Sequence, residues 1–281
     1  MSEKAENSSN VKPEIFNYYS ERFSEAARLE EDFNVVELLR TRDILERHLP
    51  APPAVVLDVG GAAGVYTVWL LEKGYEVHLI DPVPKHVEQA KEAISRLPGT
   101  HRSSATVGHG GDLKRADGCV DAVLLMGPLY HLTEKRDRIR CLREAHRVLR
   151  RGGMVFAVGI SRFASLIDGL HSGCLEDPEF AKIVERDLDE GQHRNPTGNP
   201  YYWTDAYLHL PDELEAEVRE AGFVKTKPLA IEGLGWAAKD HKKFTTDPKL
   251  SKVYLDFLRK VEEKKSLLGA SPHIAVLAHK P

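Results

Sequence analysis

A glycine-dense turn with an acid in front of it is the clearest chemical feature of the sequence. Residues 57–64 read Leu-Asp-Val-Gly-Gly-Ala-Ala-Gly, and Asp81 lies seventeen residues beyond Gly64. The glycines let the chain turn sharply and let a ligand contact main-chain atoms. A carboxylate at position 81 can accept hydrogen bonds from both hydroxyls of a ribose. Together they predict a nucleoside-type cofactor site rather than a tight turn and a helix-capping aspartate.

The positions of the glycines distinguish two cofactor classes. A dinucleotide site requires G-x-G-x-x-G, but counting from Gly60 the third and sixth positions are Ala62 and Val65. An S-adenosylmethionine site prefers an acid two residues before G-x-G-x-G, and Asp58, Gly60 and Gly64 fit that pattern. The acid suits a cofactor that carries an ammonium and a sulfonium, whereas it would repel a pyrophosphate. The sequence therefore favours S-adenosylmethionine, with a nicotinamide-dependent oxidoreductase as the weaker alternative.

Strand-like and helix-like segments alternate around these residues. We expect strands at 55–59, 76–81, 105–108, 121–127 and 154–160, and helices at 65–73, 85–97 and 134–149. Such alternation predicts a parallel sheet covered by helices on both faces. Further along, the patterns predict a helix at 211–221, a strand at 223–231, a helix at 248–267 and a strand at 273–279.

The alternation breaks between residues 161 and 207. Two short helices are expected at 163–170 and 178–188, followed by a loop rich in Gly, Asn and Pro at 191–200. An insertion of this size in a compact fold is usually a lid or a substrate-binding element. The aromatic residues in or near it favour an apolar or aromatic ligand, with packing of the lid as the alternative; they are Phe163, Tyr201, Tyr202, Trp203 and Trp236.

These motifs resemble the ordered motifs of class I S-adenosylmethionine-dependent methyltransferases. The resemblance rests on residues 57–64, Asp81, Asp117-Gly118 with 121–132, and 149–153. It implies a doubly wound α/β fold with a mostly parallel seven-stranded sheet that ends in an antiparallel hairpin. It also implies a methyltransferase domain at 51–281 with a lid insertion at 161–207. A disordered tail (1–12) and a helical N-terminal cover (13–50) would precede that domain.

The same resemblance implies where the cofactor binds. The acid and glycines of the first turn would hold the methionine part, and Asp81 would hold the ribose. The turn after the third strand would contact the adenine, and the turn after the fourth would lie beside the reactive methyl group. By analogy, residues of the N-terminal cover would fold over the cofactor. The expected contacts are Tyr19, Arg28, Asp58, Gly60, Gly61, Gly64, Asp81, Pro82, His109, Gly110, Asp112, Met126 and Leu129.

Two positions depart from the family pattern. Ala62 replaces the middle glycine, so the turn must accommodate an extra methyl group. His109 stands where the family often has an acid that contacts adenine, and Asp112 could take that role instead.

A catalytic base is needed only if the methyl acceptor must lose a proton. His131 could act as that base or orient the acceptor, and Tyr130 could line the sulfonium pocket through its ring or oxygen. The alternative is that both residues cap and pack the next helix. His209, where the chain re-enters from the lid, is the third catalytic candidate. His273, at the start of the last strand, reads slightly better as a structural histidine.

Composition narrows the class of protein. The net charge of −4 disfavours a nucleic-acid substrate, and three scattered cysteines indicate neither disulfides nor a zinc site. Neither a signal peptide nor a membrane-spanning run is evident, so we expect a soluble cytoplasmic enzyme with no metal and no membrane partner. The expected function is methylation of a small-molecule acceptor. A non-catalytic S-adenosylmethionine-binding or regulatory protein on the same fold is the alternative. The sequence does not predict the oligomeric state.

Overall fold

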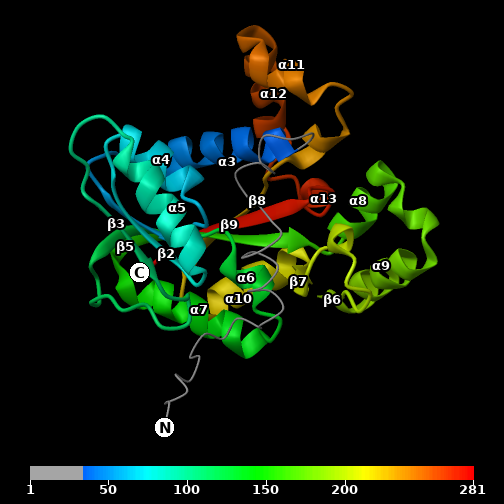
Figure 1. Cartoon of the computed structure of the whole chain (residues 1–281), viewed down its shortest axis with the longest axis horizontal. Coiled ribbons are helices and arrows are strands. Elements are labelled where there is room, and N and C mark those ends of the chain that lie inside the picture. Colours follow the sequence, from blue (N-terminus) through cyan, green and yellow to red (C-terminus); the bar gives the residue numbers. More distant parts are fainter. Residues whose placement is uncertain (1–33) are drawn as a thin grey trace.

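A nine-stranded sheet forms the centre of the protein, and seven of its strands make up its main body. The computed structural model describes residues 34–281. The strand order is β3 (Ser103–Val107), β2 (Glu76–Asp81), β1 (Val55–Val59), β4 (Val120–Leu125), β5 (Leu149–Ser161), β9 (His273–His279) and β8 (Val224–Ala230) (Figure 1). Strands β1 to β5 pair in parallel, and β9 runs antiparallel between β5 and β8. The predicted fold class is confirmed, including the closing antiparallel hairpin.

Helices cover both faces of this sheet. On one face α7 (Lys135–Val148) and α10 (Pro211–Glu220) pack against alternate residues of β1, namely Leu57 and Val59. On the other face α3 (Asn34–His48) and α4 (Val65–Glu72) pack against Val56. Helix α5 (Pro84–Ser95) covers β2 and β3. The central strands are buried on both sides, which explains why they read as continuous apolar runs. Helix α3 lies within the predicted helical cover, and residues 13–33 lie outside the described residues.

Several boundaries differ from the prediction. Strand β5 begins at Leu149, because Val120 of β4 already pairs with Leu149. The register then shifts, so that Ala122 pairs with Met154 and Gly152-Gly153 lies in the irregular part of the strand. The single helix expected at 248–267 is two helices, α12 (Pro248–Val261) and α13 (Lys265–Leu268). The buried Glu262 separates them and pairs with Arg40 and Arg47 of α3. The short α11 (His241–Thr246) was not predicted.

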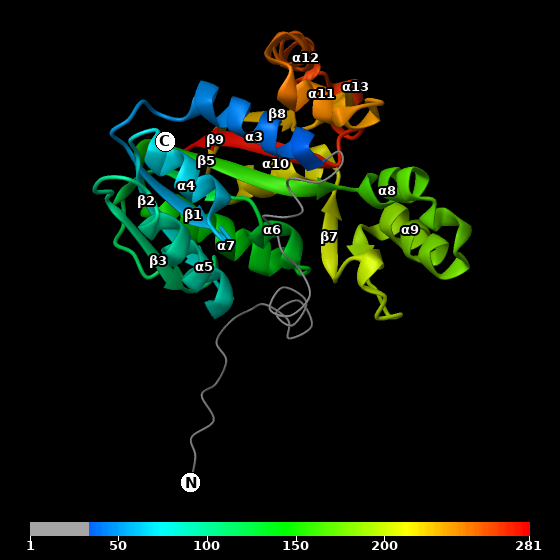
Figure 2. The ribbon, with the colours of Figure 1, turned by 45° about the horizontal axis from the view of Figure 1, so that its top comes forward.

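The segment predicted to be a lid forms a lobe beside the sheet (Figures 1 and 2). It comprises α8 (Ala164–Ser172), η1 (Cys174–Glu176), α9 (Pro178–Glu190), β6 (Gln192–His193), η2 (Pro200–Tyr202) and β7 (Ala206–His209). The lobe has its own apolar cluster, which includes Phe180 and Tyr202. It returns to the sheet through β7, which pairs in parallel with the end of β5 at Ile160. Strands β6 and β7 are too short to leave an alternating sequence pattern.

Among the described residues, no helix is both long and apolar enough to cross a membrane.

Candidate functional site

Asp58, the acid of the first turn, is fully buried at the end of β1. Its Oδ2 accepts a hydrogen bond from Thr67 Oγ1 at 2.7 Å, while its Oδ1 has no partner among the described residues. Burial raises the pKa of Asp58 to about 6, with a further increase from the nearby charge of Asp81 and only partial compensation by Thr67. A buried acceptor without a partner costs about 1–3 kcal/mol. The site therefore fits a ligand that brings a cationic donor, such as the ammonium of S-adenosylmethionine.

The glycines of this turn are required by close packing. A Cβ at Gly61 would lie 2.7 Å from both Asp58 Oδ2 and a methyl group of Leu79. A Cβ at Gly60, whose φ is 75°, would lie 2.8 Å from Pro128 Cδ. The turn is thus pressed against the segment that follows β4. This contact brings the predicted methionine site and the predicted methyl site together.

Asp81 ties the glycine turn to the start of α5. Its Oδ2 accepts from the amide of Ala62 at 3.0 Å, and its Oδ1 accepts from the amide of Val83 at 2.9 Å. His86 Nδ1 lies 3.1 Å from the same Oδ1. A carboxylate has about four acceptor sites, so capacity remains for a ribose hydroxyl. Ala62 itself has a φ of 47°, in the left-handed region that glycine adopts without strain.

The turn after β3 contains the three residues expected near the adenine. His109 is half-buried, and its Nδ1 accepts a hydrogen bond from the amide of Gly111 at 3.2 Å. Gly110 packs so tightly on α7 that a Cβ would lie 2.5 Å from Cys141 Sγ. Asp112 instead pairs with Lys114 Nζ at 2.5 Å on the surface, and this hydrogen bond lowers the pKa of Asp112. The contact of Asp112 with adenine therefore stays a prediction, and it would compete with Lys114 for the same carboxylate.

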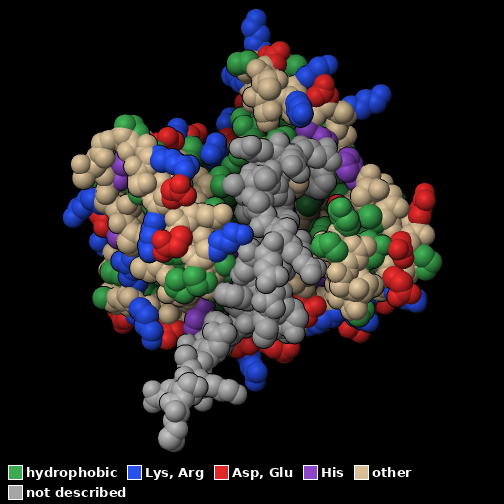
Figure 3. Space-filling view, viewed as in Figure 1, with side chains coloured by type: hydrophobic (Ala, Val, Ile, Leu, Met, Phe, Trp, Pro, Cys, Tyr) green, Lys and Arg blue, Asp and Glu red, His purple; other side chains and the backbone are tan. Residues whose placement is uncertain are grey.

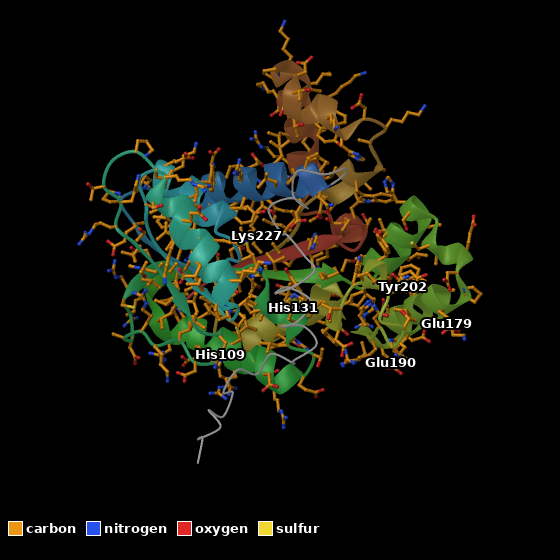
Figure 4. The ribbon with its side chains drawn as sticks, viewed as in Figure 1. His109, His131, Glu179, Glu190, Tyr202 and Lys227 are labelled. Carbon is orange, nitrogen blue, oxygen red and sulfur yellow. The ribbon has the colours of Figure 1, made fainter. Side chains whose placement is uncertain are left out.

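The turn after β4 continues into α6 (Pro128–His131). The hydroxyl of Tyr130 donates to the carbonyl of Met126 at 3.1 Å, and the Tyr130 and His131 rings meet edge-on at 4.7 Å. In Figure 4, His131 lies between His109 and the lobe. Leu129 differs from the prediction, because it is fully buried in the core cluster beside α7. It anchors α6 to the core rather than lining a ligand site.

His209 also differs from the prediction. It is fully buried at the end of β7, where its Nε2 lies 3.4 Å from Glu217 Oε2 and its ring meets that of Tyr207 at 4.7 Å. Burial lowers the pKa of His209, and the interaction with Glu217 offsets this only in part. Glu217 in turn accepts a hydrogen bond from the guanidinium of Arg138. His209 thus joins β7 to α10 and α7 and is not retained as a catalytic residue.

A histidine–glutamate pair lies at the carboxyl edge of the sheet, beside the end of β5. His273 opens β9 opposite Ile160 of β5, and its Nδ1 lies 2.6 Å from Glu232 Oε1. Glu232 Oε2 accepts from Ser271 Oγ at 2.7 Å and from the His273 amide at 2.9 Å. Burial opposes ionisation of Glu232, but the attraction of His273 and these hydrogen bonds outweigh it and lower its pKa.

Glu37 of α3 completes this cluster, with its Oε2 3.8 Å from His273 Nδ1. The ligand atoms of Glu37, Glu232 and His273 lie within 4.8 Å of one another, a separation that a metal ion could bridge. The short contact between Glu232 and His273 is better suited to a shared proton. Sequence reasoning missed Glu232, whose only signal was its position directly after a predicted strand.

An apolar groove of about 590 Å³ opens beside the end of β5. It lies between α8, the start of α10, η3 (Gly233–Ala237) and α13. Its lining includes Phe163, Leu166, Ile167, Leu210, Trp236 and Leu268. The indole of Trp236 is fixed by a 2.8 Å hydrogen bond to the carbonyl of Ala270. Of the aromatics expected near a ligand, only Phe163 and Trp236 line this groove. Tyr202 is in the core of the lobe, and Tyr201 is 80% exposed.

Tyr19 and Arg28, expected over the cofactor, lie outside the described residues. Apart from Leu129, the other expected contacts lie at or just after the carboxyl ends of β1, β2, β3 and β4.

Comparison with known proteins identifies methyltransferases. A family model described as a methyltransferase domain matches residues 56–153. An uncharacterized methyltransferase of Mycobacterium tuberculosis is 32% identical over 191 residues, covering 65% of this chain and 70% of the relative. A ribosomal RNA small subunit methyltransferase C of Alcanivorax borkumensis is 31% identical over 117 residues, covering 41% of this chain and 34% of the relative.

Solved structures agree on the fold. An S-adenosylmethionine-dependent methyltransferase of Thermotoga maritima, described as a possible histamine N-methyltransferase, superimposes with a TM-score of 0.59. It is 15% identical, and the match covers 95% of this chain and 100% of that one.

Proposed function

Since this chain belongs to the class I S-adenosylmethionine-dependent methyltransferases, we propose that it methylates a small molecule whose apolar part occupies the groove beside β5. The observation that carries the proposal is that groove, about 590 Å³ in volume and lined by Phe163, Ile167 and Trp236. Pockets of 300–1,000 Å³ with apolar walls and a few polar groups suit small ligands. A folded RNA would instead require a basic surface.

The names of the similar proteins do not select the acceptor. One relative is named as a ribosomal RNA methyltransferase, and one of the similar structures is described as a possible histamine N-methyltransferase. The acceptor class therefore rests on the groove and on the charge of the chain, which is −4.

The residues of the first four loops would hold the cofactor. Asp58 Oδ1, which is buried and has no described partner, would receive the ammonium, and Asp81 would receive the ribose. When bound, S-adenosylmethionine supplies a methyl group on a sulfonium leaving group, so the protein contributes mainly alignment and exclusion of water. We assign the alignment to the turn at Met126 and to α6, which the glycine turn contacts through Pro128.

Two histidines are candidates for accepting a proton from the acceptor. His131 is on α6, beside the predicted methyl site. His273 is two strands away, across β5, and neighbouring strands lie roughly 4.8 Å apart. Glu232 would hold the Nδ1 proton of His273 and leave Nε2 as the base, so we favour His273 as the base and His131 as an orienting residue.

The test combines cofactor binding with a choice of acceptors. Calorimetry should show binding of S-adenosylmethionine by the full chain. Release of S-adenosylhomocysteine should then occur with members of a panel of aromatic alcohols and amines, but not with ribosomal or transfer RNA. Methylation of RNA alone would overturn the small-molecule proposal. Cofactor binding without release from any acceptor would favour the non-catalytic alternative.

A further inference from the structure

Helix α12 carries an apolar stripe that faces solvent. Leu250, Val253 and Phe257 are 41%, 51% and 63% exposed, and they share one side of the helix. The neighbouring side of the helix contacts the protein, because Leu258 is buried and the Tyr254 ring stacks on Phe244 of α11 at 3.5 Å. The helix is therefore held against the protein by a different side from the one that carries the stripe.

Basic side chains surround this stripe. Residues 239–265 contain nine Lys and Arg against five Asp and Glu, although the whole chain is acidic. Among the described residues, Lys242, Lys249 and Lys260 pair with no carboxylate, and Lys260 lies 5.3 Å from the Phe257 ring. Figure 1 shows α11 and α12 projecting from the body, and Figure 3 shows Lys and Arg side chains around that projection.

Helices with this combination of features bind anionic bilayers in the plane of the headgroups, with Phe and Leu in the acyl boundary and Lys toward the phosphates. A second copy of this chain is a poorer occupant. A two-fold contact on the stripe would bring the unpaired lysines of both copies together. We propose that the hairpin of α11 and α12 is a docking surface for an anionic lipid bilayer. Such surface association needs no spanning helix, and it departs from the sequence-based expectation of no membrane partner.

The test is co-sedimentation of the full chain with vesicles. We expect binding to equal parts phosphatidylglycerol and phosphatidylcholine, and much weaker binding to phosphatidylcholine alone. Phe257→Ser should lower the affinity by at least about tenfold through lost apolar burial. Lys249→Ala and Lys260→Ala should each lower it by about fivefold. The matched controls are Leu170→Ser, at a 66% exposed apolar position on the lobe, and Lys91→Ala on α5. Both should bind as wild type.

Each other outcome overturns the proposal. Absence of binding to anionic vesicles would do so directly. Equal losses in the Leu170→Ser control would show that the effect is not specific to α12. A dimer seen by light scattering without lipid, and lost in Phe257→Ser, would assign the stripe to a second copy. Calorimetric binding of S-adenosylhomocysteine should be the same in all variants, which separates this result from any failure of the cofactor site.

Discussion

At the carboxyl edge of the sheet, the proposed cofactor half and the proposed acceptor half are assembled differently. The cofactor half consists of four successive loops between Asp58 and His131, each placed by the strand before it. The proposed acceptor half comprises two parts, the cluster of Glu37, Glu232 and His273 and the apolar groove that Phe163 and Trp236 help to line. Among the described residues, Asp58 Oδ1 in the cofactor half is buried and has no hydrogen-bond partner, whereas both carboxylate oxygens of Glu232 have partners. The cofactor half thus has a buried acceptor atom that a ligand could satisfy, whereas the polar groups of the acceptor half bind one another.

The largest expected effect is in the acceptor half. His273→Asn should lower turnover by about a hundredfold, since general-base catalysis contributes about 10²–10⁴-fold. Glu232→Gln should lower it less and should shift the pH profile of kcat, because an amide no longer stabilises a protonated His273. Affinity for S-adenosylhomocysteine should stay within about twofold of wild type in both. The comparison variant is His131→Asn. If that variant alone lost turnover, with His273→Asn unaffected, the base would belong to α6.

The next effect is in the cofactor half. Asp58→Asn should weaken S-adenosylhomocysteine binding by roughly thirtyfold, about 2 kcal/mol, through loss of a charge-assisted hydrogen bond. The same change should stabilise the unliganded protein at neutral pH. Burial raises the pKa of Asp58 from 3.8 to about 6, so the folded state holds the proton more tightly than the unfolded state.

The unliganded wild type should therefore lose up to about 3 kcal/mol of stability as pH rises from about 4 to 6, and the Asn variant should not. Thermal unfolding across this pH range measures the difference. Parallel pH curves for the two proteins would contradict the assignment of Asp58, whatever the binding result.

Asp81→Ala should weaken S-adenosylhomocysteine binding by more than about tenfold. The structure adds a second cause to the ribose contact, because this carboxylate also anchors the amides of Ala62 and Val83. His86→Ala is the matched variant, since it removes a neighbour of Asp81 without removing those anchors. Calorimetry with S-adenosylhomocysteine and with free adenosine would show whether the loss of affinity arises from the contact with the ribose, which both ligands contain. An unchanged affinity in a folded Asp81→Ala protein would rule out the ribose role.

The sequence predicted the residues of the cofactor half better than those of the acceptor half, and the difference lies in how the strands of each half pair. Gly60, Asp81 and Pro128 lie next to strands with clear apolar patterns, so their meeting at one edge follows from parallel pairing. Glu232 meets His273 only because β9 reverses direction between β5 and β8, and a one-residue change of register would turn His273 away. Leu129 and His209 were misplaced because a loop-like sequence does not reveal which side chains turn into the core.

The smallest expected effect tests the irregular position of the cofactor loop. Ala62 has a φ of 47°, and a left-handed alanine costs roughly 1–2 kcal/mol, partly offset by the greater unfolded-state entropy of glycine. Ala62→Gly should therefore stabilise the protein by about 0.5 kcal/mol, measured by denaturant unfolding. Ala63→Gly is the matched control, since Ala63 has no positive φ, and it should destabilise by a similar amount. Because the Ala62 amide stays bound to Asp81, cofactor affinity should change less than about twofold. A large gain in affinity would mean that the alanine methyl group, rather than the backbone, limits how the cofactor half receives its ligand.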